Sequence, residues 1–218
     1  MGLKIKILCS SPNHPVVPWI MRWMEDRSNH DAVSLVHSTT ELGSGDILFL
    51  ISVSEMIGPD IRTRFQHTAV VHASDLPEGR GWSPHVWAIL SGKNSIVVTA
   101  LEAAAQVDSG AIWAKTRIEI PKTALFDEIN ERLFNATLQL MTKVCDMIES
   151  GDKPQPQDGG TPSYWPRRTP VDSEIDPNES ITSQFDAIRV CDPNRYPAFF
   201  RLHGEVFEIS LKKRYEPS

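Results

Sequence analysis

Hydrophobic and polar positions follow two different periods along the N-terminal half of the chain. Alternating or continuous apolar runs, rich in Val, Ile and Leu, predict short strands at residues 3–9, 32–37, 46–53, 69–72 and 95–100. Between the first two runs, residues 16–27 place apolar side chains at helical spacing. Strands interleaved with helical segments predict an α/β domain built on a parallel sheet.

The C-terminal half has a different pattern. Residues 122–150 predict one long amphipathic helix, because apolar residues recur every three or four positions. A Gly- and Pro-rich loop at 151–160 ends it, followed by an irregular stretch at 164–173. A short helix is expected at 180–190, capped by Asn178 or Ser180, and a hairpin at 199–211 around His203 and Gly204. We therefore divide the chain into a main domain, 1–150, and a C-terminal segment, 151–218.

Composition narrows the class of protein. Hydrophobic residues make up 40% and charged residues 23% of the chain, as in ordinary globular domains. A net charge of −6 argues against non-specific nucleic-acid binding. The widely separated Cys9, Cys145 and Cys191 match neither a disulfide framework nor a zinc motif, which favours reduced thiols and a cytoplasmic location. We expect no signal peptide, membrane span or metal site, because no apolar run is long enough and the histidines lack ligand spacing.

Two polar positions stand where α/β sheets bind ligands. His72 ends a short apolar strand and opens onto a loop with two glycines and two prolines. Asp108 lies in a turn with Ser109 and Gly110. Ligand sites in open α/β sheets lie outside the carboxyl ends of strands, so His72 is a candidate, whereas Asp108 alone is weak evidence of a site. A surface histidine and a turn-forming aspartate are the alternative interpretation.

Taken together, these segments resemble the formyltransferase family. The family carries an Asn-x-His-Pro-Ser-Leu-Leu-Pro loop, an Arg-Gly-x-x-Pro-x-x-Trp-Ala-Ile-Leu-x-Gly stretch and an Asp-x-Gly turn. This chain has His-Ala-Ser-Asp-Leu-Pro at residues 72–77 and matches the other two patterns at 80–92 and 108–110. The resemblance covers about residues 1–120 by pattern. Residues 164–168, 172–175 and 189–200 are similar to the tail of sugar N-formyltransferases. The His-Ala-Ser-Asp-Leu-Pro variant looks most like short members found beside nonulosonic-sugar pathways.

The resemblance implies a Rossmann-like domain that transfers a formyl group from 10-formyltetrahydrofolate without a metal, working as a homodimer. His72 and Asp108 would then be catalytic. The folate would contact Leu76, Pro77, Arg80, Gly81 and Trp82, although Arg80 and Gly81 can equally serve to shape the loop. The acceptor, a nucleotide-linked amino sugar, would contact Ser10, Asn13, Tyr164, Trp165, Arg167, Arg168 and Tyr196. A solvated arginine pair, and a core position for Tyr196, are the alternatives at the C-terminal end.

One position departs from the family. Val70 stands two residues before His72, where the family has an Asn that donates a hydrogen bond to the developing oxyanion. Losing such a donor costs about 10²–10³ in rate. Asn13, Asn94 or a backbone N–H could replace it, or the chain could be a poor or inactive catalyst.

The predicted function is N-formylation of a nucleotide-linked amino sugar. Formylation of methionyl-tRNA is a rival, but the chain is short and acidic for it. Formylation of glycinamide ribonucleotide is another, but residues 10–15 do not match its glycine-rich phosphate loop. A non-catalytic sugar-nucleotide-binding protein is the rival from a different class, and Val70 is the reason to keep it.

Overall fold

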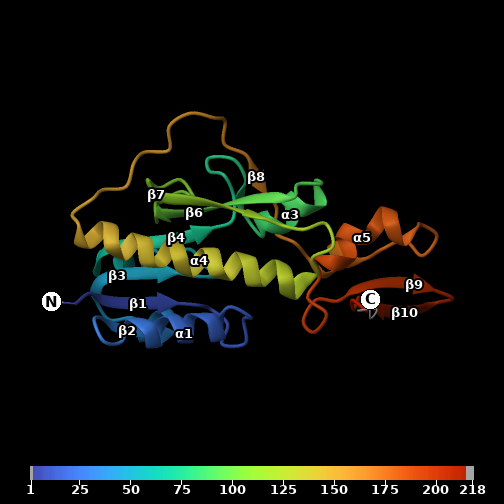
Figure 1. The fold of residues 1–218 in the computed structure, drawn as a ribbon, viewed down its shortest axis with the longest axis horizontal. Helices are drawn as coiled ribbons and strands as arrows, with labels where there is room; N and C mark the ends of the chain where they lie inside the picture. The colour runs from blue at the N-terminus through green and yellow to red at the C-terminus, as the bar shows by residue number, and fades with distance from the viewer. Residues whose placement is uncertain (1, 215–218) are drawn as a thin grey trace.

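A six-stranded mixed sheet forms the centre of the protein (Figure 1). The computed structural model describes residues 2–214. The strand order is β2-β1-β3-β4-β6-β7, in which β1 to β4 are parallel, β6 is antiparallel to β4, and β7 is antiparallel to β6. The bounds are β1 Lys4–Leu8, β2 Ala32–Val36, β3 Gly45–Leu50, β4 Phe65–His72, β6 Ser95–Glu102 and β7 Ile112–Glu119.

Both faces of the sheet are buried. On one face, α1 (Val17–Arg27) and the long α4 (Phe126–Glu149) cover the larger hydrophobic cluster, which includes Ile5, Ile7 and Phe49. On the other face, Leu8, Leu48 and neighbours form a smaller cluster near the 3₁₀ turn η1 (Thr39–Glu41) and the short α2 (Pro59–Arg62). Alternate residues at the carboxyl end of β3 face the two hydrophobic clusters, so residues 47–50 form a continuous apolar run, whereas β1 carries Lys4 before its buried isoleucines and Lys6 between them.

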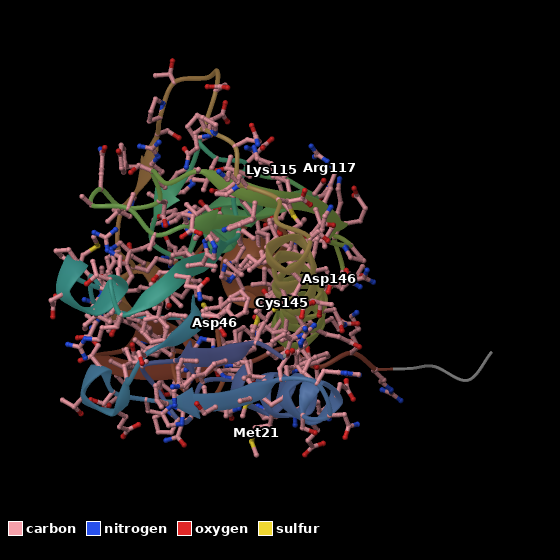
Figure 2. The ribbon with its side chains drawn as sticks, turned by 90° about the vertical axis from the view of Figure 1, so that its left-hand side faces the viewer. Met21, Asp46, Lys115, Arg117, Cys145 and Asp146 are labelled. Atoms are coloured by element: carbon pink, nitrogen blue, oxygen red, sulfur yellow. The ribbon has the colours of Figure 1, made fainter. Side chains whose placement is uncertain are left out.

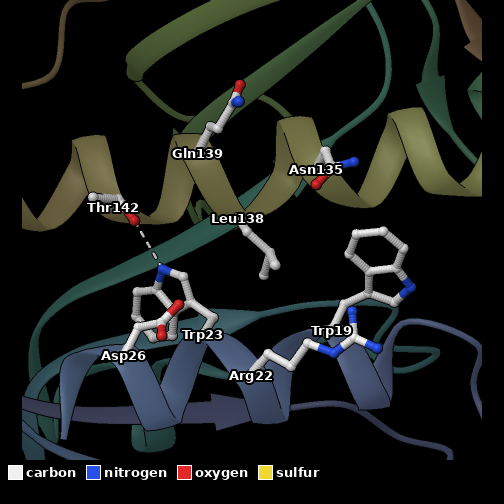
Figure 3. Close-up of a pocket in the computed structure, with 8 residues that line it drawn as sticks. All are labelled: Trp19, Arg22, Trp23, Asp26, Asn135, Leu138, Gln139 and Thr142. Atoms are coloured by element: carbon white, nitrogen blue, oxygen red, sulfur yellow. Dashed lines mark hydrogen bonds between the residues drawn. The ribbon is translucent and has the colours of Figure 1, made fainter.

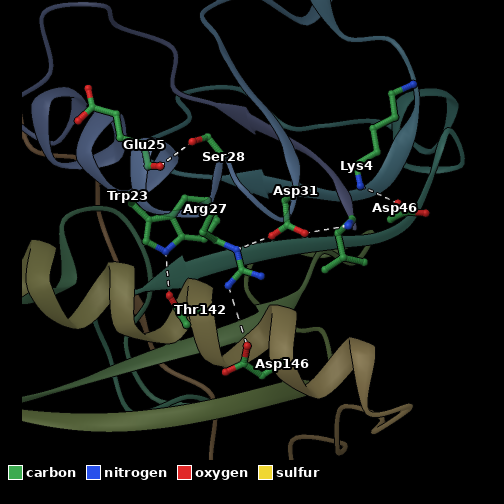
Figure 4. Close-up of polar contacts among 10 residues, drawn as sticks. Lys4, Trp23, Glu25, Arg27, Ser28, Asp31, Asp46, Thr142 and Asp146 are labelled. Carbon is green, nitrogen blue, oxygen red and sulfur yellow. Dashed lines mark hydrogen bonds and ion pairs between the residues drawn. The ribbon is translucent and has the colours of Figure 1, made fainter. Parts of the chain in front are cut away.

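Polar contacts join the two covering helices to the sheet (Figure 4). The buried carboxylate of Asp31 accepts hydrogen bonds from the Leu3 backbone N–H at 2.8 Å and from Arg27 Nε at 2.6 Å. Trp23 Nε1 on α1 donates to Thr142 Oγ1 on α4 at 2.8 Å. These bonds satisfy groups that would be costly to bury unpaired, and they fix α1 against both β1 and α4.

The C-terminal segment first adds one strand to a two-stranded sheet with the main domain, and then forms a separate small unit. β8 (Tyr164–Trp165) pairs in parallel with β5 (Arg80–Gly81), just before α3 (Pro84–Leu90). Beyond η2 (Pro170–Ser173), helix α5 (Ile181–Arg189) and the hairpin of β9 (Ala198–Leu202) and β10 (Glu205–Ile209) follow. The hairpin lies beyond one end of the main sheet (Figure 1). A third cluster of Ile175, Ile188, Cys191 and Ala198 packs this unit.

The α/β, Rossmann-like fold class is confirmed, with three corrections of detail. The sheet is not wholly parallel, because β6 and β7 run antiparallel. Residues 112–119 form a strand that the hydrophobic pattern missed, and residues 164–165 form another within the stretch taken as irregular. Ser180, not Asn178, caps α5: its hydroxyl accepts a bond from the Ser183 backbone N–H. No helix among residues 2–214 is long and apolar enough to cross a membrane.

The core predicts a large contrast between two methionines. Met141 on α4 is fully buried, whereas Met21 on α1 is 53% exposed and lies on the outer surface (Figure 2). Met141→Ala should lower the free energy of unfolding by about 2–5 kcal/mol, because it leaves a cavity. Met21→Ala should change it by less than about 0.5 kcal/mol. Urea unfolding followed by tryptophan fluorescence measures both, and equal effects would contradict the assigned core.

Candidate active site

His72 is held at the carboxyl end of β4 with its ring almost entirely buried. Only 8% of the residue is exposed. Its Nε2 lies 2.9 Å from the carbonyl oxygen of Gly79. A carbonyl oxygen only accepts, so Nε2 carries the hydrogen and donates it. The other ring nitrogen, Nδ1, is therefore the one that can take or give a proton.

Asp108 is the acidic group that faces this nitrogen. Asp108 Oδ2 lies 3.6 Å from His72 Nδ1, and the same oxygen accepts a 2.9 Å hydrogen bond from the Gly81 backbone N–H. Asp108 adopts a left-handed backbone conformation with φ of 50°, which suits a turn. The structure thus brings together the two residues that the sequence pattern singled out as catalytic. A histidine and a carboxylate in this arrangement can share a proton taken from a substrate.

Arg80 adds a buried positive charge beside this pair. It is 7% exposed, and its guanidinium donates to the Tyr164 hydroxyl at 3.1 Å and to Gln157 Oε1 at 2.8 Å. Among residues 2–214 no carboxylate forms an ion pair with it, and its buried Nε has no hydrogen-bond partner. A buried cation without a counter-ion is unfavourable, so the arrangement suits an anionic or strongly polar ligand.

The loop that follows His72 packs tightly against β8. Gly81 has a φ of 99°, and a Cβ there would come within 2.5 Å of the Trp165 carbonyl oxygen. Leu76 is buried, and its carbonyl accepts a 2.7 Å bond from Lys115 Nζ. Trp82 is exposed, with the Arg167 guanidinium 4.7 Å from its ring centre. Gly81 therefore has the positive φ expected for it and also makes a close backbone approach.

Other predicted site residues lie less directly against the pair. No hydrogen bond in the described part of the chain links Ser10 or Asn13 to His72 or Asp108: the Ser10 hydroxyl accepts from the Ser54 N–H, and Asn13 is exposed. Arg168 donates to the Asp172 carbonyl at 2.7 Å. Tyr196 is exposed beside Arg195, so it is not a core aromatic residue.

The sequence pattern did not point to two further histidines near the site, His14 and His85, because neither has metal-ligand spacing. Burial and, to a smaller extent, the charges of His72, His14 and Arg168 together lower the pKa of His85, at the start of α3, to about 4. Burial and the charge of Arg195 likewise lower the pKa of His14 to about 4. Both imidazoles are therefore neutral at pH 7. No cluster among residues 2–214 could hold a metal ion.

Val70 offers no replacement for the family's asparagine. It pairs with Leu50 and Leu101 in the sheet, and its side chain packs against the smaller hydrophobic cluster. Asn13 and Asn94, the two candidates for the missing donor, are both exposed. A hydroxyl does lie on β4 two residues before Val70, where Thr68 Oγ1 is buried without a partner.

Two surface hollows lie away from the histidine–aspartate pair. They have volumes of about 340 and 350 Å³ and flank Trp19, between α1 and α4; Figure 3 shows the one lined by Trp23 and Leu138. Neither contains His72, Asp108 or Arg80. Residues 155–165 instead lie against the loop at 79–82, which explains why His72 and Asp108 are enclosed.

The structure is that of an α/β protein with a histidine–carboxylate pair at the carboxyl end of β4. Comparison with known proteins gives the family. The model of the formyl transferase family matches residues 12–145, more than half of the chain. The chain therefore belongs to the formyl transferase family.

The curated methionyl-tRNA formyltransferases that match this chain are longer than it is. It is 30% identical over 151 residues to the methionyl-tRNA formyltransferase of Natranaerobius thermophilus and 28% identical over 158 residues to that of Sulfurihydrogenibium sp.. These matches cover 68% and 71% of this chain but 48% and 51% of the relatives. The chain thus spans about half the length of the curated relatives it matches.

Solved structures agree on the fold. A methionyl-tRNA formyltransferase from Clostridium thermocellum matches with a TM-score of 0.83 at 22% identity, over 98% of this chain and 94% of that one. HypX from Aquifex aeolicus in complex with tetrahydrofolic acid matches with 0.81 at 20%, over 97% and 38%. A sugar N-formyltransferase from Shewanella sp. matches with 0.72 at 13%, over 99% of both chains. Similarity at these identities shows the fold alone.

The lowered histidine pKa values predict that acid destabilises the fold. The unfolded chain binds a proton at His85 below pH 6.5, whereas the folded chain does so only near pH 4. The free energy of unfolding should therefore fall between pH 6.5 and 4, by up to about 1.4 kcal/mol per pH unit for each such histidine. His85→Gln should reduce this slope by about 1 kcal/mol per pH unit, as measured by urea unfolding. His203→Gln, at an exposed position, is the matched control; an equal reduction there would refute the assignment to half-buried His85.

Proposed function

We propose that this chain transfers a formyl group from 10-formyltetrahydrofolate to the amino group of a nucleotide-linked amino sugar. The observation that carries the proposal is the His72–Asp108 pair, which lies at the carboxyl end of β4 in a chain of the formyl transferase family. Fold similarity to a HypX structure that contains tetrahydrofolic acid supports the folate donor. Fold similarity to a sugar N-formyltransferase supports the sugar acceptor.

Groups beside the pair fit a folate. A folate has an aromatic ring system at one end and carboxylates at the other. Arg80 provides a buried guanidinium that pairs with no carboxylate among the described residues, and Trp82 provides an exposed aromatic ring. Leu76 and Pro77 supply apolar surface in the same loop. 10-Formyltetrahydrofolate would supply the formyl group bound to nitrogen, ready for attack by an amine.

The residues of the site would then take one proton from the sugar amine and give one proton to the folate nitrogen. The neutral amine of the sugar attacks the formyl carbon, so that a new C–N bond forms and the carbonyl oxygen gains negative charge. Asp108 takes the proton that the amine loses and passes it to His72 Nδ1, or His72 Nδ1 takes it directly. His72 then delivers this proton from Nδ1 to the folate nitrogen as the bond between that nitrogen and the formyl carbon breaks and the C=O bond re-forms. The amine loses one proton and tetrahydrofolate gains one, so Asp108 and His72 end as they began.

C-terminal groups supply the chemistry of a sugar-nucleotide site. Arg167 and Arg168 can pair with a diphosphate, and the exposed Tyr164 and Tyr196 can stack on a base. Trp165 stacks on Trp87 with ring centres 5.6 Å apart, and its role in this site would be to support its neighbours. Ser10 and Asn13 would contact the sugar from the loop after β1. We further expect a cytoplasmic homodimer.

Two other functions have specific support. Methionyl-tRNA as the acceptor is favoured by the names of the sequence relatives and opposed by the net charge of −6. A binding protein without catalysis is favoured by Val70, which gives the oxyanion no side-chain donor.

Mass spectrometry tests the proposal directly. The protein is incubated with 10-formyltetrahydrofolate and a panel of UDP-, dTDP- and GDP-linked amino sugars, with formylatable methionyl-tRNA and glycinamide ribonucleotide as separate arms. A protein-dependent gain of one formyl group on a sugar nucleotide is the expected result. Formylation of tRNA or of the ribonucleotide alone would replace the sugar acceptor. No formylation together with thermal protection by the sugars would establish the binding protein instead.

The catalytic pair predicts loss of turnover without loss of fold. His72→Ala and Asp108→Ala should each lower kcat by at least about 10²-fold, because each removes a proton-transfer group. His203→Ala and Asp152→Ala, at exposed positions, are the matched controls. Circular dichroism checks the fold of every variant. Near-normal turnover in either site variant would remove that residue from the mechanism.

A further inference from the structure

A segment outside the family match contacts Asp108 directly and His72 through one intermediate residue, Gly79. Residues 155–165, here called the strap, connect α4 to the C-terminal unit and follow the family-matched residues 12–145. We propose that the strap positions the catalytic groups, with Gln157 fixing Asp108 and Ser163 fixing His72. This inference rests on the proposed function, which makes His72 and Asp108 the reacting groups.

Gln157 holds the backbone of the aspartate turn. Its amide nitrogen donates to the carbonyl oxygens of Asp108 and Gly110, each at 2.8 Å. Gly110 has no room to move toward β6, because even a Cβ there would lie 1.8 Å from the Glu102 carbonyl oxygen. Two bonds on one side and close packing on the other fix the turn. As a result, the Asp108 carboxylate is directed at His72 and at the Gly81 N–H.

The amide of Gln157 can adopt only one orientation. Its oxygen accepts a 2.8 Å bond from Arg80, whose guanidinium can only donate. Its nitrogen faces two carbonyls, which can only accept. Rotating the amide by 180° would place donor against donor and acceptor against acceptor. Gln157 is therefore a fixed link between the buried cation and the Asp108 turn.

Ser163 holds the other side of the pair. Its hydroxyl oxygen accepts a 2.9 Å bond from the Gly79 N–H, and its carbonyl accepts one from the Arg80 N–H, also at 2.9 Å. The Gly79 carbonyl is the group that accepts from His72 Nε2. The Ser163 carbonyl thus fixes the peptide between Gly79 and Arg80, and its hydroxyl fixes the peptide before Gly79. The Gly79 carbonyl in turn decides which nitrogen of His72 carries the hydrogen, and so which one faces Asp108.

The strap is itself anchored to the sheet and contains its own control position. Gln155 exchanges two backbone hydrogen bonds with Ile112 of β7, of 2.6 and 2.8 Å. Its side chain is exposed and bonds only to the Lys153 carbonyl. Gln155→Ala therefore removes the same side chain two residues away without touching the turn.

Kinetics of the full-length chain test Gln157. Gln157→Ala and Gln157→Glu should each lower kcat by about 10- to 100-fold, with KM for donor and acceptor within about threefold, because a displaced reacting group slows the chemical step. Gln155→Ala should retain wild-type kcat. Gln157→Glu keeps an acceptor for Arg80 but loses both donors to the turn. Wild-type kcat in Gln157→Glu would show that the residue serves only Arg80, and equal losses in Gln155→Ala and Gln157→Ala would show a general effect of the strap; either result would overturn the proposal.

Imidazole ¹⁵N NMR provides a readout that needs no activity. In the wild-type chain, with the His72 signals assigned by comparison with His72→Gln, the ring should carry its hydrogen on Nε2. Ser163→Ala should shift these ring ¹⁵N signals toward a mixture of the two neutral forms, and Gln157→Glu should shift Nδ1 alone. Unchanged His72 signals in both variants would overturn the proposal even if the wild-type protein formylates nothing. If the shifts occur while the mass-spectrometric assay is negative, the proposed function fails and the positioning role stands.

Discussion

Burial of the central strands on both faces is the constraint that organises this protein. Ile5 and Ile7 of β1 and Phe49 of β3 belong to the larger hydrophobic cluster, and Leu8, Leu48 and Leu50 to the smaller one on the other face. Because an apolar centre offers few partners to polar side chains, the candidate site lies at a strand end. His72 is the last residue of β4, and Asp108 comes six residues after β6 ends. The position of the site thus follows from the way the core is packed.

A site made of buried polar groups needs partners for each of them, and here the partners come from far along the chain. Arg80 depends on Tyr164 and Gln157, and Gly79 depends on Ser163. A buried polar network is stable only when its members are satisfied, so the loop after β4 and the segment after α4 form one structural unit. The family motifs supply His72 and Asp108, the proposed reacting groups, and residues outside those motifs complete their surroundings.

The sequence predicted the elements better than their directions. Apolar runs revealed β1, β3 and β6 because those strands are buried, whereas β7 was missed because Lys115 and Arg117 interrupt its pattern at the edge of the sheet. Periodicity carries no information on strand direction, so the antiparallel β6 was unforeseen. The resemblance to the formyltransferase family did predict that His72 and Asp108 lie in one site. Gln157, in a polar loop, gave no sequence signal, because its importance comes from three atoms that only folding brings close.

The three cysteines give the chain an internal reporter of its own integrity. Cys9, Cys145 and Cys191 are all free and buried. Burial raises the pKa of Cys9 and raises that of Cys145, on the buried face of α4, to about 12, so at these two positions the nucleophilic thiolate form is scarce as well as shielded. A thiol-specific dye can label them only when the fold opens. The rate of labelling therefore measures how often the native state opens, and no engineered probe is needed.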